Sequence, residues 1–186
     1  MSQPGRSMRP MTDLATTGYT VDDLDWLRDE IGVAHLELDP WGSLIVSPAT
    51  DEHEIAQGHL TVQAARQLDP AEYSVLPSMP WTVPGGSGYL MIPDLTVLTA
   101  SCQRDGELHL NPPPLLVVEI ASPSTRRADR GRKLADYRLG GAELYLLVDL
   151  PAGFELHDFA AGTVVTAMGQ IDLVVGGEPV RCSLPA

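Results

Sequence analysis

Two acidic residues lie in apolar surroundings where an idle charge would be costly. Asp94 follows Ile92-Pro93 and precedes an apolar run, and Glu119 lies inside the apolar run from Leu115 to Ile120. Acidic side chains are almost never buried unless they are paired or bind a metal. A pairing with arginine, or turn chemistry at Asp94, would also explain them. Mg²⁺ takes one or two protein carboxylates and assists phosphodiester hydrolysis. We therefore expect a metal site at Asp94 and Glu119.

The third candidate for chemistry is an amine. Lys133 is the only lysine in a chain with 12 basic residues. An amine beside two carboxylates and a metal can orient the attacking water or neutralise developing charge. Lys133 is therefore the candidate partner of the two acids.

Arginines precede this lysine, and their role has two interpretations. Arg126, Arg127 and Arg130 could contact the phosphates of a nucleic acid. They could equally form a solvated helix face paired with Asp129 and Asp136. The net charge of −13 argues against nucleic acid, because proteins that bind it usually carry a basic face.

Hydrophobic patterning predicts the elements that position these residues. The first part should begin with a helix from Thr20 to Ile31 that ends at Gly32, followed by a hairpin of residues 35–38 and 43–46. A second helix is expected from Thr50 to about Leu68. Strand-like segments should follow between Tyr73 and Thr99, interrupted by a turn at Pro84–Gly88, and then a polar loop from Ser101 to Pro114.

The clearest pattern is a strand–helix–strand unit around Glu119. The run from Leu115 to Ile120 is typical of a strand buried on both faces, as is the run from Leu144 to Val148. A helical pattern from Arg127 to Leu139 separates them and ends at Gly140-Gly141. Short links predict that the two strands are parallel. Short strands should follow as far as Ser183.

Several of these segments resemble the Uma-type restriction endonuclease family, within the PD-(D/E)xK nuclease superfamily. The most specific segment is Val117-Val118-Glu119-Ile120-Ala121-Ser122-Pro123-Ser124. The other matching segments are Ile92 to Leu95, Lys133 with Tyr137, Tyr145 to Asp149, and the Glu37 to Val46 hairpin followed by His53. The resemblance covers roughly residues 19 to 175.

The resemblance implies an α/β fold with a restriction-endonuclease-like mixed sheet flanked by helices, preceded by an N-terminal helix and hairpin. It implies Mg²⁺, or Mn²⁺, bound by Asp94 and Glu119, with Lys133 as the catalytic lysine. In the superfamily's usual pattern the lysine stands two residues after the second acid, where this chain has Ala121. Lys133 lies instead in the following helix, which can fold back over its own strand.

Three further residues are site candidates. Glu37 could add a carboxylate, although it could also be a surface residue of the hairpin. His53 could contact substrate or support the site, although a histidine near a helix start is often only a polar surface residue. Gln57 lies one helical turn beyond His53 on the same face.

Length and composition predict one domain at residues 19–186 after a flexible tail at residues 1–18. No apolar run reaches the ~20 residues of a membrane span, the N-terminus does not resemble a secretory signal, and two distant cysteines suggest reduced thiols. These features predict a soluble, cytoplasmic protein.

Three functions remain open. The first is a DNA endonuclease, expected by analogy to be a homodimer. The second is a catalytically silent binding protein on a nuclease fold. The third is a metal-dependent hydrolase of a non-DNA substrate, which would remove the conflict with the net charge.

Overall fold

A computed structural model describes residues 19–20, 23–24, 27, 36–38, 43–46, 50–83, 90–123 and 125–185. The expected tail, the end of the first helix at Gly32 and the turn at Pro84–Gly88 lie outside the described residues.

The core is a six-stranded mixed sheet whose strands lie in the spatial order β12-β11-β10-β9-β6-β3. In chain order these strands are β3 (Tyr73–Pro77), β6 (Leu95–Thr99), β9 (Leu116–Ala121), β10 (Leu144–Asp149), β11 (Gly153–Asp158) and β12 (Thr163–Ala167). β9 and β10 pair in parallel, as predicted, and their neighbours pair antiparallel. Every residue of β9 and β10 is buried, because helices or strands cover both faces of the sheet at its centre.

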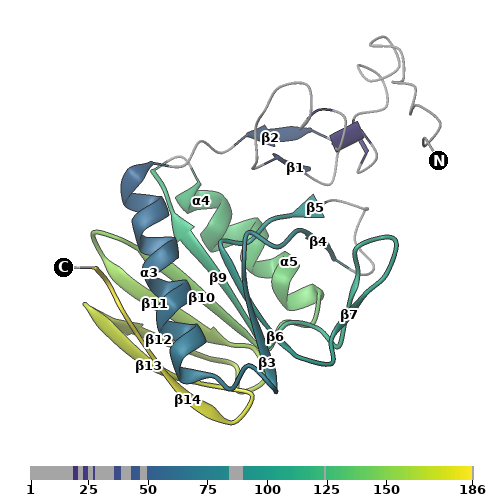
Figure 1. Ribbon diagram of the computed structural model, residues 1–186. Coiled ribbons are helices and arrows are strands. Elements are labelled where there is room, and N and C mark those ends of the chain that lie inside the picture. Colours follow the sequence, from purple (N-terminus) through teal and green to yellow (C-terminus); the bar gives the residue numbers. More distant parts are fainter. Residues whose placement is uncertain are drawn as a thin grey trace.

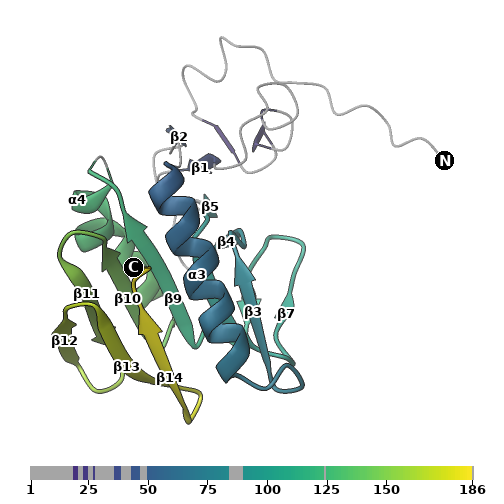
Figure 2. The same ribbon diagram turned by 60° about the vertical axis from the view of Figure 1, so that its left-hand side comes forward.

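One face of the sheet is covered by α3 (Asp51–Gln67) and by the hairpin of β13 (Gln170–Val175) and β14 (Glu178–Ser183) (Figure 1, Figure 2). α3 is the helix predicted from Thr50 to about Leu68. The Thr50 side chain caps it by accepting a hydrogen bond from the backbone N–H of His53 at 3.3 Å. Leu116, Val118 and Ile120 face this layer.

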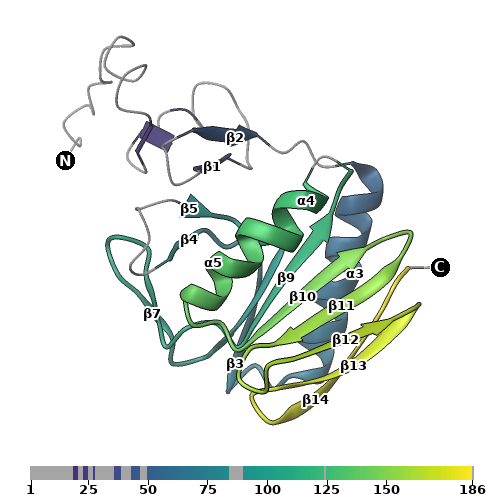
Figure 3. The ribbon, with the colours of Figure 1, turned by 180° about the vertical axis from the view of Figure 1, so that it is seen from behind.

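The opposite face is covered by one continuous helical segment (Figure 3). It consists of α4 (Arg126–Ala128), a π-helical turn η1 (Asp129–Lys133) and α5 (Leu134–Leu139). Because side chains alternate along a strand, Val117, Glu119 and Ala121 all face this helical segment.

Short strands form the rest of the described chain. The predicted first hairpin is present as β1 (Leu36–Leu38) paired antiparallel with β2 (Leu44–Val46), and β4 (Trp81–Thr82) pairs with β5 (Leu90–Met91). The expectation of a loop from Ser101 to Pro114 was wrong in part, because β7 (Gln103–Arg104) and β8 (Leu110–Asn111) form a small hairpin. The Asp105 carboxylate closes the turn of this hairpin by accepting hydrogen bonds from the backbone N–H groups of Glu107 and His109. Such polar contacts leave no hydrophobic pattern from which the hairpin could be predicted.

Candidate active site

The two candidate acids lie side by side on adjacent strands. Leu95 of β6 pairs with Val118 of β9 in an antiparallel register, which puts Asp94 next to Glu119 on the face of the helical segment. Asp94 and Glu119 are 5% and 4% exposed. The Asp94 Oδ2 atom accepts a hydrogen bond from the backbone N–H of Ile120 at 2.6 Å. The sheet therefore joins two carboxylates that lie 25 positions apart in the sequence.

The lysine reaches the same point from the helix above. Its Nζ atom lies 3.1 Å from Glu119 Oε1 and 3.1 Å from Glu37 Oε1. Lys133 ends the π-helical turn, and its side chain is 8% exposed. The displacement of the lysine away from position 121 is thus compensated, because the helix packs over the strand that carries Glu119.

The helical segment presents a row of polar groups to the site at four-residue spacing. Asp129, Lys133 and Tyr137 are all buried and turn toward the sheet. The Tyr137 hydroxyl donates to Glu119 Oε1, and the Tyr145 hydroxyl of β10 donates to the backbone carbonyl of Asp129 at 3.0 Å. π-Helical turns are often found at functional sites, and here one carries both Asp129 and Lys133.

The remaining candidates also meet at this site. The Glu37 Oε1 atom accepts from the backbone N–H of Ile92 at 3.0 Å, and the side chain is buried rather than on the surface. His53 Nε2 lies 3.1 Å from Asp94 Oδ1. Gln57 Nε2 donates to the Asp94 backbone carbonyl at 2.7 Å. The two α3 residues thus hold the side chain and the backbone of Asp94.

This geometry agrees with the comparison to known families. Residues 29–161 match the model of the Uma2 family, which is described as a putative restriction endonuclease. The chain belongs to the Uma2 family. A crystal structure of a putative nuclease belonging to DUF820 from Anabaena variabilis shares the fold, with a TM-score of 0.53 and 16% identity over 72% of this chain and 87% of that chain. No curated protein matches the chain.

The resemblance read from the sequence and the restriction-endonuclease-like mixed sheet are therefore confirmed. Within the described residues, no helix is long and apolar enough to cross a membrane. Both cysteines, Cys102 and Cys182, are free thiols.

Electrostatically, the Uma2 site contains more acids than cations. Burial raises the pKa of Glu119 well above its usual range, Lys133 acts against that rise, and the neighbouring acids add to it. Burial alone would lower the pKa of Lys133, but the surrounding carboxylates outweigh it and raise that pKa, so the amine stays protonated. The four acids that act on Lys133 are Glu119, Glu37, Asp129 and Asp94.

Restriction-endonuclease-like nucleases generally use divalent metal ions, which need oxygen donors from the protein. Among the described residues, no group of three or more His, Cys, Asp or Glu side chains is placed to hold a metal. Mg²⁺ commonly takes only one or two carboxylates and completes its shell with water and substrate phosphate. Asp94 and Glu119 supply two carboxylates, which is within that number. The excess of buried negative charge also favours a cation at this position.

Two arginines of the helical segment pair with acids on β10 and β11. Arg126 lies 2.9 Å from Asp149, while Arg130 lies 3.3 Å from Asp149 and 3.2 Å from Glu155. The interpretation that paired the arginines with Asp129 does not hold, because Asp129 faces the core. Arg127 is exposed, and it lines a hollow of about 530 Å³ with Arg126 and Arg130.

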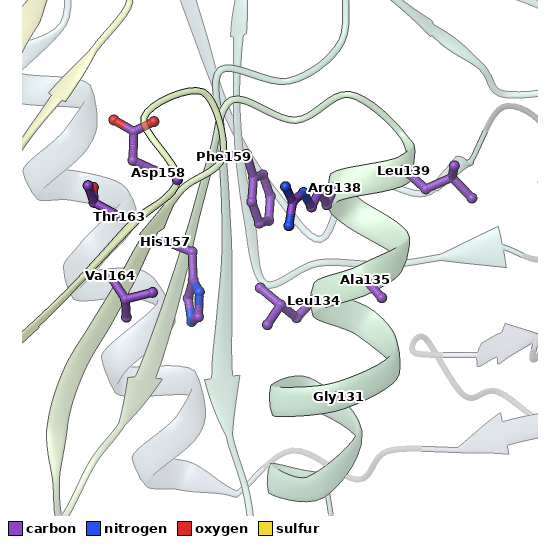
Figure 4. A pocket seen from close by; sticks show the side chains of 11 residues that line it. Gly131, Leu134, Ala135, Arg138, Leu139, His157, Asp158, Phe159, Thr163 and Val164 are labelled. Atoms are coloured by element: carbon purple, nitrogen blue, oxygen red, sulfur yellow. The ribbon is translucent and has the colours of Figure 1, made fainter.

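A second pocket, of about 540 Å³, lies on the outer side of the same helical segment, against β11 and β12. Figure 4 shows Leu134 and Arg138 pointing from the helix toward His157 and Phe159. Its lining includes neither Asp94 nor Glu119, so it is separate from the candidate active site.

The sequence analysis assigned no site role to Asp129. It named Tyr137 and Tyr145 only as matches to the family pattern, without a role in the site. The signal that could have found Asp129 is the spacing Asp129-Lys133-Tyr137, which puts three polar groups on one helix face. That face points inward, so each of these groups needs a partner.

The contact between His53 and Asp94 predicts a pH-dependent stability in metal-free buffer. The hydrogen bond to Asp94 raises the pKa of His53 above its ordinary 6.5, with burial acting against it. The stabilisation should be fully present below the unfolded-state pKa and should be lost as pH rises through the raised folded-state value. We expect the difference in free energy of unfolding between wild type and His53→Gln to shrink from about pH 6 to pH 8.5. Urea unfolding with EDTA at several pH values measures it.

A matched control is His59→Gln on the same helix, where the ring contacts Gln63 rather than a carboxylate. A His53→Gln difference that stays constant or grows with pH would show that the contact with Asp94 does not favour the protonated ring.

Proposed function

We propose that this Uma2 protein is a metal-dependent endonuclease that hydrolyses phosphodiester bonds in DNA. Asp94 and Glu119 are the metal ligands, and Lys133 is the catalytic amine. The observation that carries the proposal is the 3.1 Å contact between Lys133 Nζ and Glu119 Oε1, beside Asp94 on the adjacent strand. An apolar sheet position that holds two acids and a charged amine is costly unless the group has a chemical task.

Each side chain has a task in this scheme. Mg²⁺, when bound, supplies Lewis-acid stabilisation of phosphate charge and a water of lowered pKa. Lys133 holds a proton at Nζ and offers positive charge where the transition state gains negative charge. Tyr137 fixes one oxygen of Glu119. His53 and Gln57 fix Asp94, and Glu37 holds Lys133 from the hairpin side.

DNA is favoured over a small substrate by the arginine-lined hollow beside the site. Arg126, Arg127 and Arg130 supply phosphate contacts there, next to Asp149 at the end of β10. Asp149 pairs with Ala121, two residues beyond Glu119, so the hollow and the acids share one edge of the sheet. A homodimer is part of the proposal, because cutting both strands of a duplex requires two such sites.

The test combines metal binding with cleavage. We expect wild type to bind Mg²⁺ or Mn²⁺ in isothermal titration and to nick supercoiled plasmid only with one of these ions. DNA affinity measured with Ca²⁺ should fall steeply with salt, and Arg127→Ala should lower it without changing metal binding. Metal binding without DNA affinity would favour a hydrolase of a non-DNA substrate.

A catalytically silent binding protein is the second candidate. It is favoured by the contacts that already occupy both oxygens of Asp94, to His53 and to the Ile120 N–H. Absence of metal binding both with and without DNA would select this candidate over the nuclease.

A further inference from the structure

Asp129 is a buried acid with few partners for its charge. The residue is 1% exposed, and within the described part of the chain neither carboxylate oxygen makes a hydrogen bond of good geometry. Burial raises the pKa of Asp129 and outweighs the Thr125 side chain, which acts to lower that pKa. The nearest cation is Lys133, whose Nζ atom lies 3.7 Å from Oδ1, close enough for an ion pair but too far for a hydrogen bond. Burying a carboxylate in this way costs free energy.

The backbone holds this carboxylate against the ammonium. The Tyr145 hydroxyl of β10 donates to the Asp129 backbone carbonyl at 3.0 Å, which ties the π-helical turn to the sheet. Lys133 ends the same turn, four residues later, so both side chains lie on the buried face. The nearby arginines pair with Asp149 instead, so Asp129 is not held there as their counter-ion.

Lys133 also has a donor to spare for this acid. An ammonium has three N–H donors, and Glu119 accepts one of them at 3.1 Å. Glu37 Oε1 lies 3.1 Å from the same nitrogen as a second ion-pair partner. Asp129 is the third carboxylate around the same nitrogen. Its charge attracts the ammonium from the helical segment itself, and so opposes movement of the amine toward Glu37 and the hairpin.

We propose that Asp129 is a positioning residue that holds the Lys133 ammonium at Glu119, and that the fold gives up stability to keep it there. The inference rests on the proposed nuclease function and extends it to a residue outside the acids and lysine of that site. Because four acids surround one ammonium, removal of this charge should relieve repulsion instead of leaving Lys133 unpaired. Stability and activity should therefore change in opposite directions.

The test uses Asp129→Asn, which keeps the size of the side chain and removes its charge. We expect the melting temperature to rise by about 2 °C or more. We expect kcat for plasmid nicking to fall about 10- to 100-fold with KM nearly unchanged, as when a group that orients a functional residue is removed. Asp129→Glu restores the charge and should recover part of the lost kcat.

A third readout does not need activity. Lys133 is the only lysine, so protein labelled with ¹⁵N-lysine gives a single side-chain ammonium signal. That signal should move in Asp129→Asn. It should stay in place in the control Asp172→Asn, an exposed acid on β13 paired with Arg181.

A lower melting temperature or an unmoved lysine signal in Asp129→Asn overturns the inference, as does an unchanged kcat in an active enzyme. If wild type cuts no DNA, the proposed function fails by itself. The melting temperature and the lysine signal then still decide whether Asp129 holds Lys133.

Discussion

Replacing Lys133 with methionine is expected to abolish cleavage and to destabilise the fold at the same time. Methionine fills similar space but removes the cation that Glu37, Glu119 and Asp129 surround. Breaking a buried ion pair from one side typically costs about 3–5 kcal/mol, because the remaining charges are left without compensation. The loss of a catalytic amine should lower kcat by roughly 10²- to 10⁴-fold. Urea unfolding and plasmid nicking measure the two effects.

The matched control is Arg132→Met, one residue earlier in the same π-helical turn and more exposed than Lys133. Its free energy of unfolding should lie within about 0.5 kcal/mol of the wild-type value, as is usual for substitutions away from the core. Lys133→Arg keeps the charge but not the compact shape of the ammonium, so it should recover stability more than activity. A Lys133→Met protein that unfolds like wild type would mean that the three acids are protonated or solvated, contrary to the geometry.

Replacing Glu119 with glutamine is expected to remove activity while leaving the fold at least as stable. The substitution removes one proposed metal ligand. It also removes a carboxyl group whose pKa is raised well above its usual range by burial. Loss of a bound metal removes several kcal/mol of transition-state stabilisation, which corresponds to roughly 10³-fold or more in rate. Lys133 keeps Glu37 and Asp129 as partners, so the amine is not stranded. Isothermal titration of Mn²⁺, nicking and urea unfolding measure the three properties.

Glu143→Gln is the control for this substitution. Glu143 is exposed and precedes the first residue of β10, at the opposite end of the strand from Asp149. It should keep metal binding and activity. If Glu119→Gln still binds the metal with wild-type affinity and cuts DNA, Glu119 is not a ligand. The opposite stability effects at Lys133 and Glu119 also separate a functional site from a purely structural ion pair, in which either loss would destabilise.

Local sequence patterns were enough to predict where the two acids lie and which elements carry them. An acid inside the run from Leu115 to Ile120 has few explanations, and period-two alternation puts Glu119 on the same face as Val117 and Ala121. The strand–helix–strand unit follows from local patterns and from the handedness of short connections. The segments around Asp94, Glu119 and Lys133 were also enough to indicate the family, which the match over residues 29–161 confirms.

The tertiary structure alone decided which of these groups meet. Nothing in the local sequence states that Glu37 reaches Lys133, or that His53 reaches Asp94, because these contacts depend on how distant elements pack against the sheet. The inward position of Asp129, away from the arginines, depends on how the helical segment packs against the sheet. Local patterns fix the face of an element, but long-range packing fixes what that face touches.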